Sequence, residues 1–235
     1  LKRQYLKSGY YLFYYKEIAD LVIKTVTVID YGMSNLRSVS KALEHVAGNG
    51  WQALVSDKVE VILHADKVVF PGQGAIGNCM TLLKQTEVAS IIQQTLDNKP
   101  FLGICLGLQT LLTRSEESGG TPGFNWATGT VRRFIEPLID PNNGERLKIP
   151  HMGWNQVQHT QPHPLWTGIP DNSRFYFVHS YYVDPEDSSV VAGTTPYGGI
   201  NFTSAVGQDN VFAVQFHPEK SQHAGLTLLK NFLDW

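Results

Sequence analysis

The chain contains few cysteines and no cluster of basic residues. Its 235 residues include only Cys79 and Cys105, which form no C-x-x-C pair. This argues against a disulfide framework and against a structural zinc site. The formal net charge is −2, and lysines and arginines are scattered along the chain, which argues against a broad nucleic-acid surface. No apolar run is long enough to cross a bilayer.

The composition is ordinary for a globular protein. A chain of this length can bury a sizeable core in one large α/β domain, and 42% apolar residues is typical of that class. Free thiols fit a reducing cytosol, so we predict a cytoplasmic protein. We also predict that it needs neither a metal nor a cofactor. Cys79 falls in an expected helix, where a buried small residue is the simplest interpretation. Cys105 therefore becomes the residue of interest.

Glycines flank Cys105 on both sides. The segment Gly103–Gly107 has the sequence Gly-Ile-Cys-Leu-Gly. An apolar run at 101–104 predicts a buried parallel strand, and residues 106–112 predict a helix directly after it. This is the G-x-nucleophile-x-G elbow with cysteine in place of serine. A sulfur at a helix N-terminus is favoured as the reactive thiolate.

A base for this thiol is found far downstream. Residues 211–216, Val-Phe-Ala-Val-Gln-Phe, predict a strand that ends in His217-Pro218-Glu219. Because Pro218 disfavours a helical His217, we expect the histidine in extended chain just past a strand end. His217 would take the proton of Cys105, and Glu219 would orient the imidazole. Taken alone, Cys105 is most simply a buried small residue, and His217 is most simply a hydrogen-bonded histidine. The two motifs occurring together favour catalysis.

A glycine-containing loop follows a third predicted strand at 67–70. Its sequence is Pro71-Gly72-Gln73-Gly74. Backbone N–H groups of this loop, with that of Leu106, would form an oxyanion hole. A phosphate site is the alternative, but no Walker-type lysine follows and the spacing is not G-x-G-x-x-G.

These motifs together resemble the triad-type (class I) glutamine amidotransferases. Three further segments narrow the resemblance to the family of glutaminase subunits of imidazole glycerol phosphate synthase. These segments cover residues 28–36 (Val-Ile-Asp-Tyr-Gly-Met-Ser-Asn-Leu), 149–155 (Ile-Pro-His-Met-Gly-Trp-Asn) and 176–181 (Tyr-Phe-Val-His-Ser-Tyr). The resemblance extends from about Thr25 to Trp235.

The resemblance implies that glutamine is hydrolysed to glutamate and ammonia by a Cys105–His217–Glu219 triad. It assigns the oxyanion hole and the glutamine site to seven residues: Gly72, Gln73, Gly74, Leu106, Gln109, Ser180 and Tyr181. It also implies a surface that docks on a (β/α)₈-barrel cyclase subunit in a heterodimer, made of His151, Met152, Gly153, Trp154 and Asn155. Ammonia would pass to that partner, which makes imidazole glycerol phosphate and AICAR in histidine biosynthesis. A tryptophan such as Trp154 is as typical of a core position as of an interface. The surrounding motif favours the interface.

Three alternative functions remain open at this point. A paralogous glutaminase could supply another synthase, such as one that aminates a surface-polysaccharide sugar. A stand-alone cysteine hydrolase would need no ammonia acceptor. A non-enzymatic binding subunit is disfavoured by the intact Cys105, His217 and Glu219.

The pattern along the chain predicts an α/β fold like that of class I glutamine amidotransferases. It comprises a central, mostly parallel sheet flanked by helices, with mixed and antiparallel strands in the second half. Ser34 is the expected N-cap of a first helix, and residues 136–146 are expected to form an exposed loop. We expect residues 25–235 to form the glutaminase domain. Residues 1–24 are expected to be an extension, disordered or created by a start assigned too early, with Val22 as an alternative start.

Overall fold

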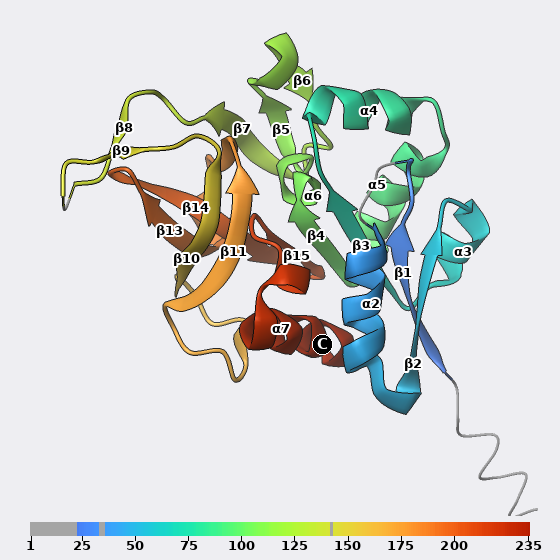
Figure 1. The fold of residues 1–235 in the computed structure, drawn as a ribbon. Coiled ribbons are helices and arrows are strands. Elements are labelled where there is room, and N and C mark those ends of the chain that lie inside the picture. Colours follow the sequence, from blue (N-terminus) through green and yellow to red (C-terminus); the bar gives the residue numbers. More distant parts are fainter. Residues whose placement is uncertain (1–22, 33–35, 142) are drawn as a thin grey trace, which may run out of the picture.

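The computed structural model describes residues 23–32, 36–141 and 143–235. Five parallel strands form one half of its large sheet, in the order β2-β1-β3-β4-β15 (Figure 1). They are β1 (Lys24–Ile29), β2 (Trp51–Ser56), β3 (Lys67–Gly72), β4 (Phe101–Cys105) and β15 (Val211–Val214). The strand β4 lies between β3 and β15, so that the ends of these three strands share one edge of the sheet.

Helices cover both faces of this parallel part (Figure 1). One face carries α2 (Leu36–Ala47) and α7 (Gln222–Asp234), and the other carries α3 (Val59–His64), α4 (Ile76–Lys84) and α5 (Val88–Asn98). Successive strand residues face opposite sides. Val69 and Leu102 therefore join the core beneath α2 and α7, whereas Val68 and Phe101 join the core beneath α3 to α5. Among the described residues, no helix is long and apolar enough to span a bilayer.

The second half of the sheet is mainly antiparallel. Beyond β15 the sheet continues in the order β14 (Ile200–Gln208), β12 (Tyr181–Pro185), β7 (Ala127–Arg133), β5 (Leu112–Ser115) and β6 (Thr121–Pro122). A branch from β14 contains β13 (Val191–Tyr197), β10 (His151–His159) and β11 (Ser173–His179), which Figure 1 shows projecting away from the parallel strands. The predicted fold class, a mostly parallel sheet with added antiparallel strands, is confirmed.

The helix predicted at 106–112 is too long. The helix α6 covers only Leu106–Gln109, and Leu112 already belongs to β5. Leu111 and Leu112 are buried, and the Leu111 carbonyl accepts the N–H groups of Trp126 and Ala127. Pairing with a distant segment therefore ends the helix, which the local pattern could not reveal. One turn also gives a much weaker helix dipole at Cys105 than the sequence implied.

Residues 136–146 are not entirely an exposed loop. They contain β8 (Leu138–Ile139) and the start of β9 (Arg146–Leu147), which pair antiparallel. Leu138 is buried against Gly198. Short 3-10 helices cover Gly48–Gly50, Glu117–Gly119, Pro164–Trp166, Ser188–Val190 and Pro218–Lys220. The expected cap Ser34 and the extension up to Val22 lie outside the described residues.

Candidate active site

Three predicted site segments meet where parallel strands end. Gly72 ends β3 and pairs in register with Cys105, the last residue of β4. His217 lies three residues past β15, the other neighbour of β4, and its N–H donates to the Tyr176 carbonyl at 2.9 Å. Carboxyl ends of parallel strands are where α/β folds place their ligands. The fold therefore brings together segments more than a hundred residues apart.

Cys105 has a strained backbone. Its φ is 55° and its ψ is −105°, outside the conformations that L residues ordinarily adopt. The flanking Gly107 permits a close packing contact, because a Cβ there would lie 2.0 Å from the backbone oxygen of Phe70. The tight strand-to-helix joint thus requires a glycine two residues after the cysteine. The joint holds the thiol at the sheet edge.

Replacing Gly107 by alanine should destabilise the protein. The added methyl group would overlap a strand carbonyl that cannot move independently of β3, at a cost of about 3 kcal/mol. Thermal unfolding followed by circular dichroism should show a Tm lower by roughly 6–12 °C. The matched control is Gly50→Ala, where a Cβ meets no atom within 4 Å. Equal melting temperatures for the two variants would contradict the packing argument.

His217 is held by Glu219. Its Nδ1 lies 2.9 Å from Glu219 Oε1, and both side chains are buried. Burial lowers the pKa of His217, but the facing Cys105 sulfur and the Glu219 carboxylate raise it more, to about 10. His217 Nε2 has no hydrogen-bond partner among the described residues. The protonated form of His217 is therefore favoured, and its Nε2 is available for proton transfer.

A cavity of about 410 Å³ opens at Cys105, a size suited to a small ligand. Of the predicted residues, Gly72 and Glu219 lie outside its lining, and the lining includes Cys105, His217, Gln73, Gly74, Leu106, Gln109, Ser180 and Tyr181. Gly74 has φ 84°, a conformation that favours glycine. Leu106 begins α6, so its N–H has no acceptor within the helix. These are suitable groups for an oxyanion hole.

Gln109 is fixed by two hydrogen bonds. Its Nε2 donates to the Tyr181 carbonyl at 3.2 Å and to Gln215 Oε1 at 3.1 Å. Since both amide hydrogens are used, any hydrogen bond to a ligand in the cavity falls to Gln109 Oε1. The side chain can therefore accept from a ligand ammonium or amide.

Several residues at the site were not predicted. Gln215 contacts Cys105 and Gln109, and Pro150, Lys220 and Glu117 line the cavity. Glu117 also accepts the Ile76 N–H at 2.8 Å, which ties the start of α4 to the cavity wall. Gln215 carried a signal, as the polar residue within an otherwise apolar strand, and Lys220 directly follows the predicted triad. Pro150 belongs to the motif at 149–155 but was not predicted to line the cavity, and Glu117 carried no signal.

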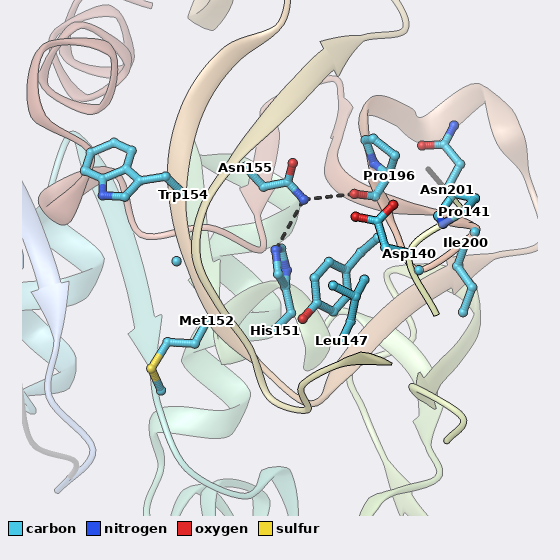
Figure 2. A pocket seen from close by; sticks show the side chains of 14 residues that line it. Asp140, Pro141, Leu147, His151, Met152, Trp154, Asn155, Pro196, Ile200 and Asn201 are labelled. Atoms are coloured by element: carbon cyan, nitrogen blue, oxygen red, sulfur yellow. Dashed lines mark hydrogen bonds between the residues drawn. The ribbon is translucent and has the colours of Figure 1, made fainter. Parts of the chain in front are cut away.

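The predicted docking segment forms the first half of β10. Met152 is 62% exposed and Trp154 37% exposed, whereas His151 is buried. Figure 2 shows Met152 and Trp154 on one side of the strand, and His151 and Asn155 on the other. Together with Gly153, all four line a pocket of about 480 Å³. Two large apolar side chains are thus presented to solvent, with His151 beneath them.

A hydrogen-bonded histidine pair lies under this segment. His179 Nδ1 is 2.7 Å from the Tyr181 carbonyl, and His179 Nε2 is 2.9 Å from His151 Nδ1. Burial lowers the pKa of both rings, to about 3 for His179 and about 4 for His151, so both are neutral at pH 7. His179 must donate through Nδ1, and His151 must then donate to it. Asn155 completes the chain, donating to His151 Nε2 and to the Pro196 carbonyl (Figure 2).

Comparison with known families agrees with this geometry. The family described as glutamine amidotransferase class-I matches residues 27–235. The imidazole glycerol phosphate synthase subunit HisH of Dechloromonas aromatica is 54% identical over 212 residues, which is 90% of this chain and 97% of the relative. Those of Hydrogenovibrio crunogenus (52%, covering 90% and 97%) and Methylococcus capsulatus (54%, covering 91% and 97%) are similar to the same degree.

The fold is shared with solved glutamine amidotransferases. One crystal structure superposes with a TM-score of 0.65 at 16% identity, covering 89% of this chain and 97% of the other. A glutamine amidotransferase of Thermotoga maritima gives a TM-score of 0.58 at 18% identity, covering 84% and 76%. At such low identity these structures establish the architecture alone.

The chain therefore belongs to the class-I glutamine amidotransferases, and it is a glutaminase of that class. Within the class, it belongs to the family of imidazole glycerol phosphate synthase subunit HisH proteins. The family predicted from the sequence motifs is thereby confirmed.

Proposed function

We propose that this chain hydrolyses glutamine through Cys105, His217 and Glu219 as the glutaminase subunit of imidazole glycerol phosphate synthase. The observation that carries the proposal is one cavity that holds a strained cysteine facing a Glu219-bound imidazole. The near-complete coverage of HisH relatives at more than 50% identity supports the same function. Each residue type has a defined task in amide hydrolysis.

In the first half-reaction, Cys105 Sγ attacks the side-chain carbonyl carbon of glutamine. The oxygen gains negative charge, which N–H groups of the loop at 72–74 and of Leu106 stabilise. The C–N bond then breaks, and His217 gives its Nε2 proton to the departing nitrogen. Ammonia leaves, and a γ-glutamyl thioester remains on Cys105.

In the second half-reaction, water attacks the thioester carbonyl while His217 takes a proton from it. The C–S bond breaks, glutamate leaves, and the Cys105 thiolate facing a His217 imidazolium is restored. Glu219 stays ionised throughout and keeps Nδ1 protonated. Gln109 and the backbone of Ser180 and Tyr181 hold the substrate in the cavity.

The ammonia acceptor is proposed to be a (β/α)₈-barrel cyclase subunit that docks on the segment His151–Asn155. The exposed Met152 and Trp154 are suitable anchors for an interface. The cyclase would combine ammonia with a ribulosylated aminoimidazole-carboxamide nucleotide to give imidazole glycerol phosphate and AICAR. A cytoplasmic location follows from that pathway.

The function is tested by measuring glutamate release from glutamine. The rate is compared for the chain alone, for the chain with the cyclase subunit, and for that complex with the nucleotide ligand of the cyclase. A rise of about 100-fold or more in kcat is expected if the ligand-bound partner reorients the loop at 72–74 toward the substrate oxygen, since one oxyanion-hole donor contributes on this scale. Activity that the partner does not change would favour a stand-alone hydrolase.

A related assay tests the alternative that this chain supplies ammonia to a paralogous synthase. If the complex forms imidazole glycerol phosphate from an ammonium salt but not from glutamine, the cyclase is active yet receives no ammonia from this chain, and the histidine-pathway partner is the wrong one. HisH relatives that match almost their whole length favour the histidine pathway over the surface-polysaccharide alternative.

Replacing Trp154 by alanine should weaken the complex. Truncation of an aromatic anchor at the centre of an interface costs about 2 kcal/mol or more, so Kd for the cyclase subunit should rise at least about tenfold. Titration calorimetry measures the change. The control is Val55→Ala on β2, an equally exposed apolar residue (44%) outside the docking segment. Equal affinities of the two variants would remove Trp154 from the interface.

A further inference from the structure

Gln215 is a fully buried polar side chain beside the nucleophile. It directly follows β15 and lies between Val214 and Phe216, which are also fully buried. An amide in such surroundings is costly unless its polar atoms are hydrogen-bonded. Its backbone N–H donates to the Ser204 carbonyl at 2.9 Å, which anchors the residue to β14. The partners of its side chain are therefore the informative ones.

The two ends of the Gln215 amide contact two different site residues. Its Oε1 accepts the Gln109 Nε2–H at 3.1 Å, and its Nε2 donates to Cys105 Sγ at 3.6 Å. The orientation of the amide follows from the network, because a flipped Gln215 would place its NH₂ group against the NH₂ group of Gln109. Gln109 is held in turn by the Tyr181 carbonyl. The donor end of Gln215 is thus directed at the sulfur.

A hydrogen bond to sulfur has a direction of effect. A thiolate accepts more strongly than a thiol, so an amide N–H at Sγ favours the ionised form and restricts where the sulfur lies. Besides Gln215, the groups that face Cys105 are His217 and Tyr31, while Lys220 and Glu117 line the same cavity. Among the described residues, none of these is hydrogen-bonded to the Gln215 amide.

We propose that Gln215 is a positioning residue that binds the Cys105 thiolate and holds it in register with Gln109. The inference rests on the proposed role of Cys105 as nucleophile. A single amide then links the attacking atom to the residue that receives the substrate. Since near-attack geometry holds the reacting atoms about 3–3.5 Å apart and a misplacement of about 1 Å is costly, this link affects turnover and not only folding.

The test compares Gln215→Met with the wild-type chain. Methionine has nearly the same volume but can neither donate to sulfur nor accept from Gln109. The rate of Cys105 alkylation by iodoacetamide is measured from pH 5 to 10, using mass spectrometry of the Cys105 peptide. The pH at which the rate is half-maximal should rise by about one unit. In the cyclase complex, kcat should fall by about 10- to 100-fold and KM should rise.

Gln215→Glu separates the two contacts. Its carboxyl oxygen still accepts from Gln109, so KM should stay close to that of the wild type. It replaces the amide donor by a carboxyl group that opposes ionisation of the neighbouring sulfur when it is itself ionised, so kcat should fall most at alkaline pH. The matched control is Gln208→Met, an exposed glutamine at the end of β14, which should change neither alkylation nor turnover.

Two results would overturn the proposal. One is a Gln215→Met variant with the wild-type pH profile of alkylation, whatever its stability. The other is the same KM change in the methionine and glutamate variants. Failure of the proposed function looks different, because wild-type complex would then release no glutamate. A shifted alkylation profile in an inactive complex would support Gln215 while contradicting the proposed function.

Discussion

Replacing Cys105 by alanine is expected to lower kcat for glutamine hydrolysis by at least about 10⁴-fold. The covalent thioester cannot form without the sulfur, and neither His217 nor the oxyanion loop supplies another nucleophile. The effect should be confined to chemistry, because Cys105 is a small residue whose strained backbone comes from its neighbours. Glutamate release is measured in the cyclase complex, and cyclase binding is measured separately by calorimetry.

Cys79 provides the matched control. It is also buried, and burial raises the pKa of its thiol to about 11, so it remains a thiol at neutral pH. Cys79→Ala should keep turnover within about threefold of the wild type, as expected for a cysteine that only fills space. Retained hydrolysis in Cys105→Ala would overturn the nucleophile assignment, and loss in both variants would indicate a folding defect.

The sequence alone predicted that Cys105, His217 and Glu219 lie close together, as the structure shows. The glycines around Cys105 and the proline after His217 are local constraints on the backbone, and each acts within a few residues. Strand positions on either side were also predictable, because buried parallel strands appear as short apolar runs. The three motifs then meet at one edge, since β3, β4 and β15 are neighbours and parallel.

What could not be predicted depends on contacts between distant segments. The early end of α6 follows from pairing of Leu112 with Ala127. The orientation of Gln215 depends on Gln109, more than a hundred residues away. Similarly, His151 resembled a surface residue of the docking segment, but its partner is His179 on the adjacent strand β11. No local pattern contains these pairings.

The buried histidine pair connects the predicted docking segment to the predicted glutamine site. The Tyr181 carbonyl accepts from both His179 and Gln109, so the hydrogen bonds continue from Asn155 to Cys105. Because both rings are neutral, each has one donor and one acceptor, and every bond in the chain has a fixed direction.

Replacing Glu219 by glutamine is expected to lower kcat by about 10³- to 10⁴-fold. Glu219 Oε1 accepts from His217 Nδ1 at 2.9 Å, which leaves Nε2 as the nitrogen that would exchange protons with Cys105 and the substrate in the proposed mechanism. An amide NH₂ at the same place would donate to Nδ1 and stabilise the opposite tautomer. KM should change much less, because Glu219 does not line the cavity.

The pH profile of this variant separates the orientation of His217 from simple loss of structure. In the wild type, the Cys105 sulfur and, to a smaller extent, the Glu219 carboxylate raise the pKa of His217, so kcat/KM falls on the alkaline side only as that imidazolium deprotonates. Without the carboxylate the pKa of His217 decreases, and the alkaline decline should move to lower pH. Glu44→Gln, an exposed glutamate on α2, should leave the profile unchanged. An unshifted decline in Glu219→Gln would mean that the carboxylate does not control the His217 proton, and the triad would reduce to a Cys105–His217 pair.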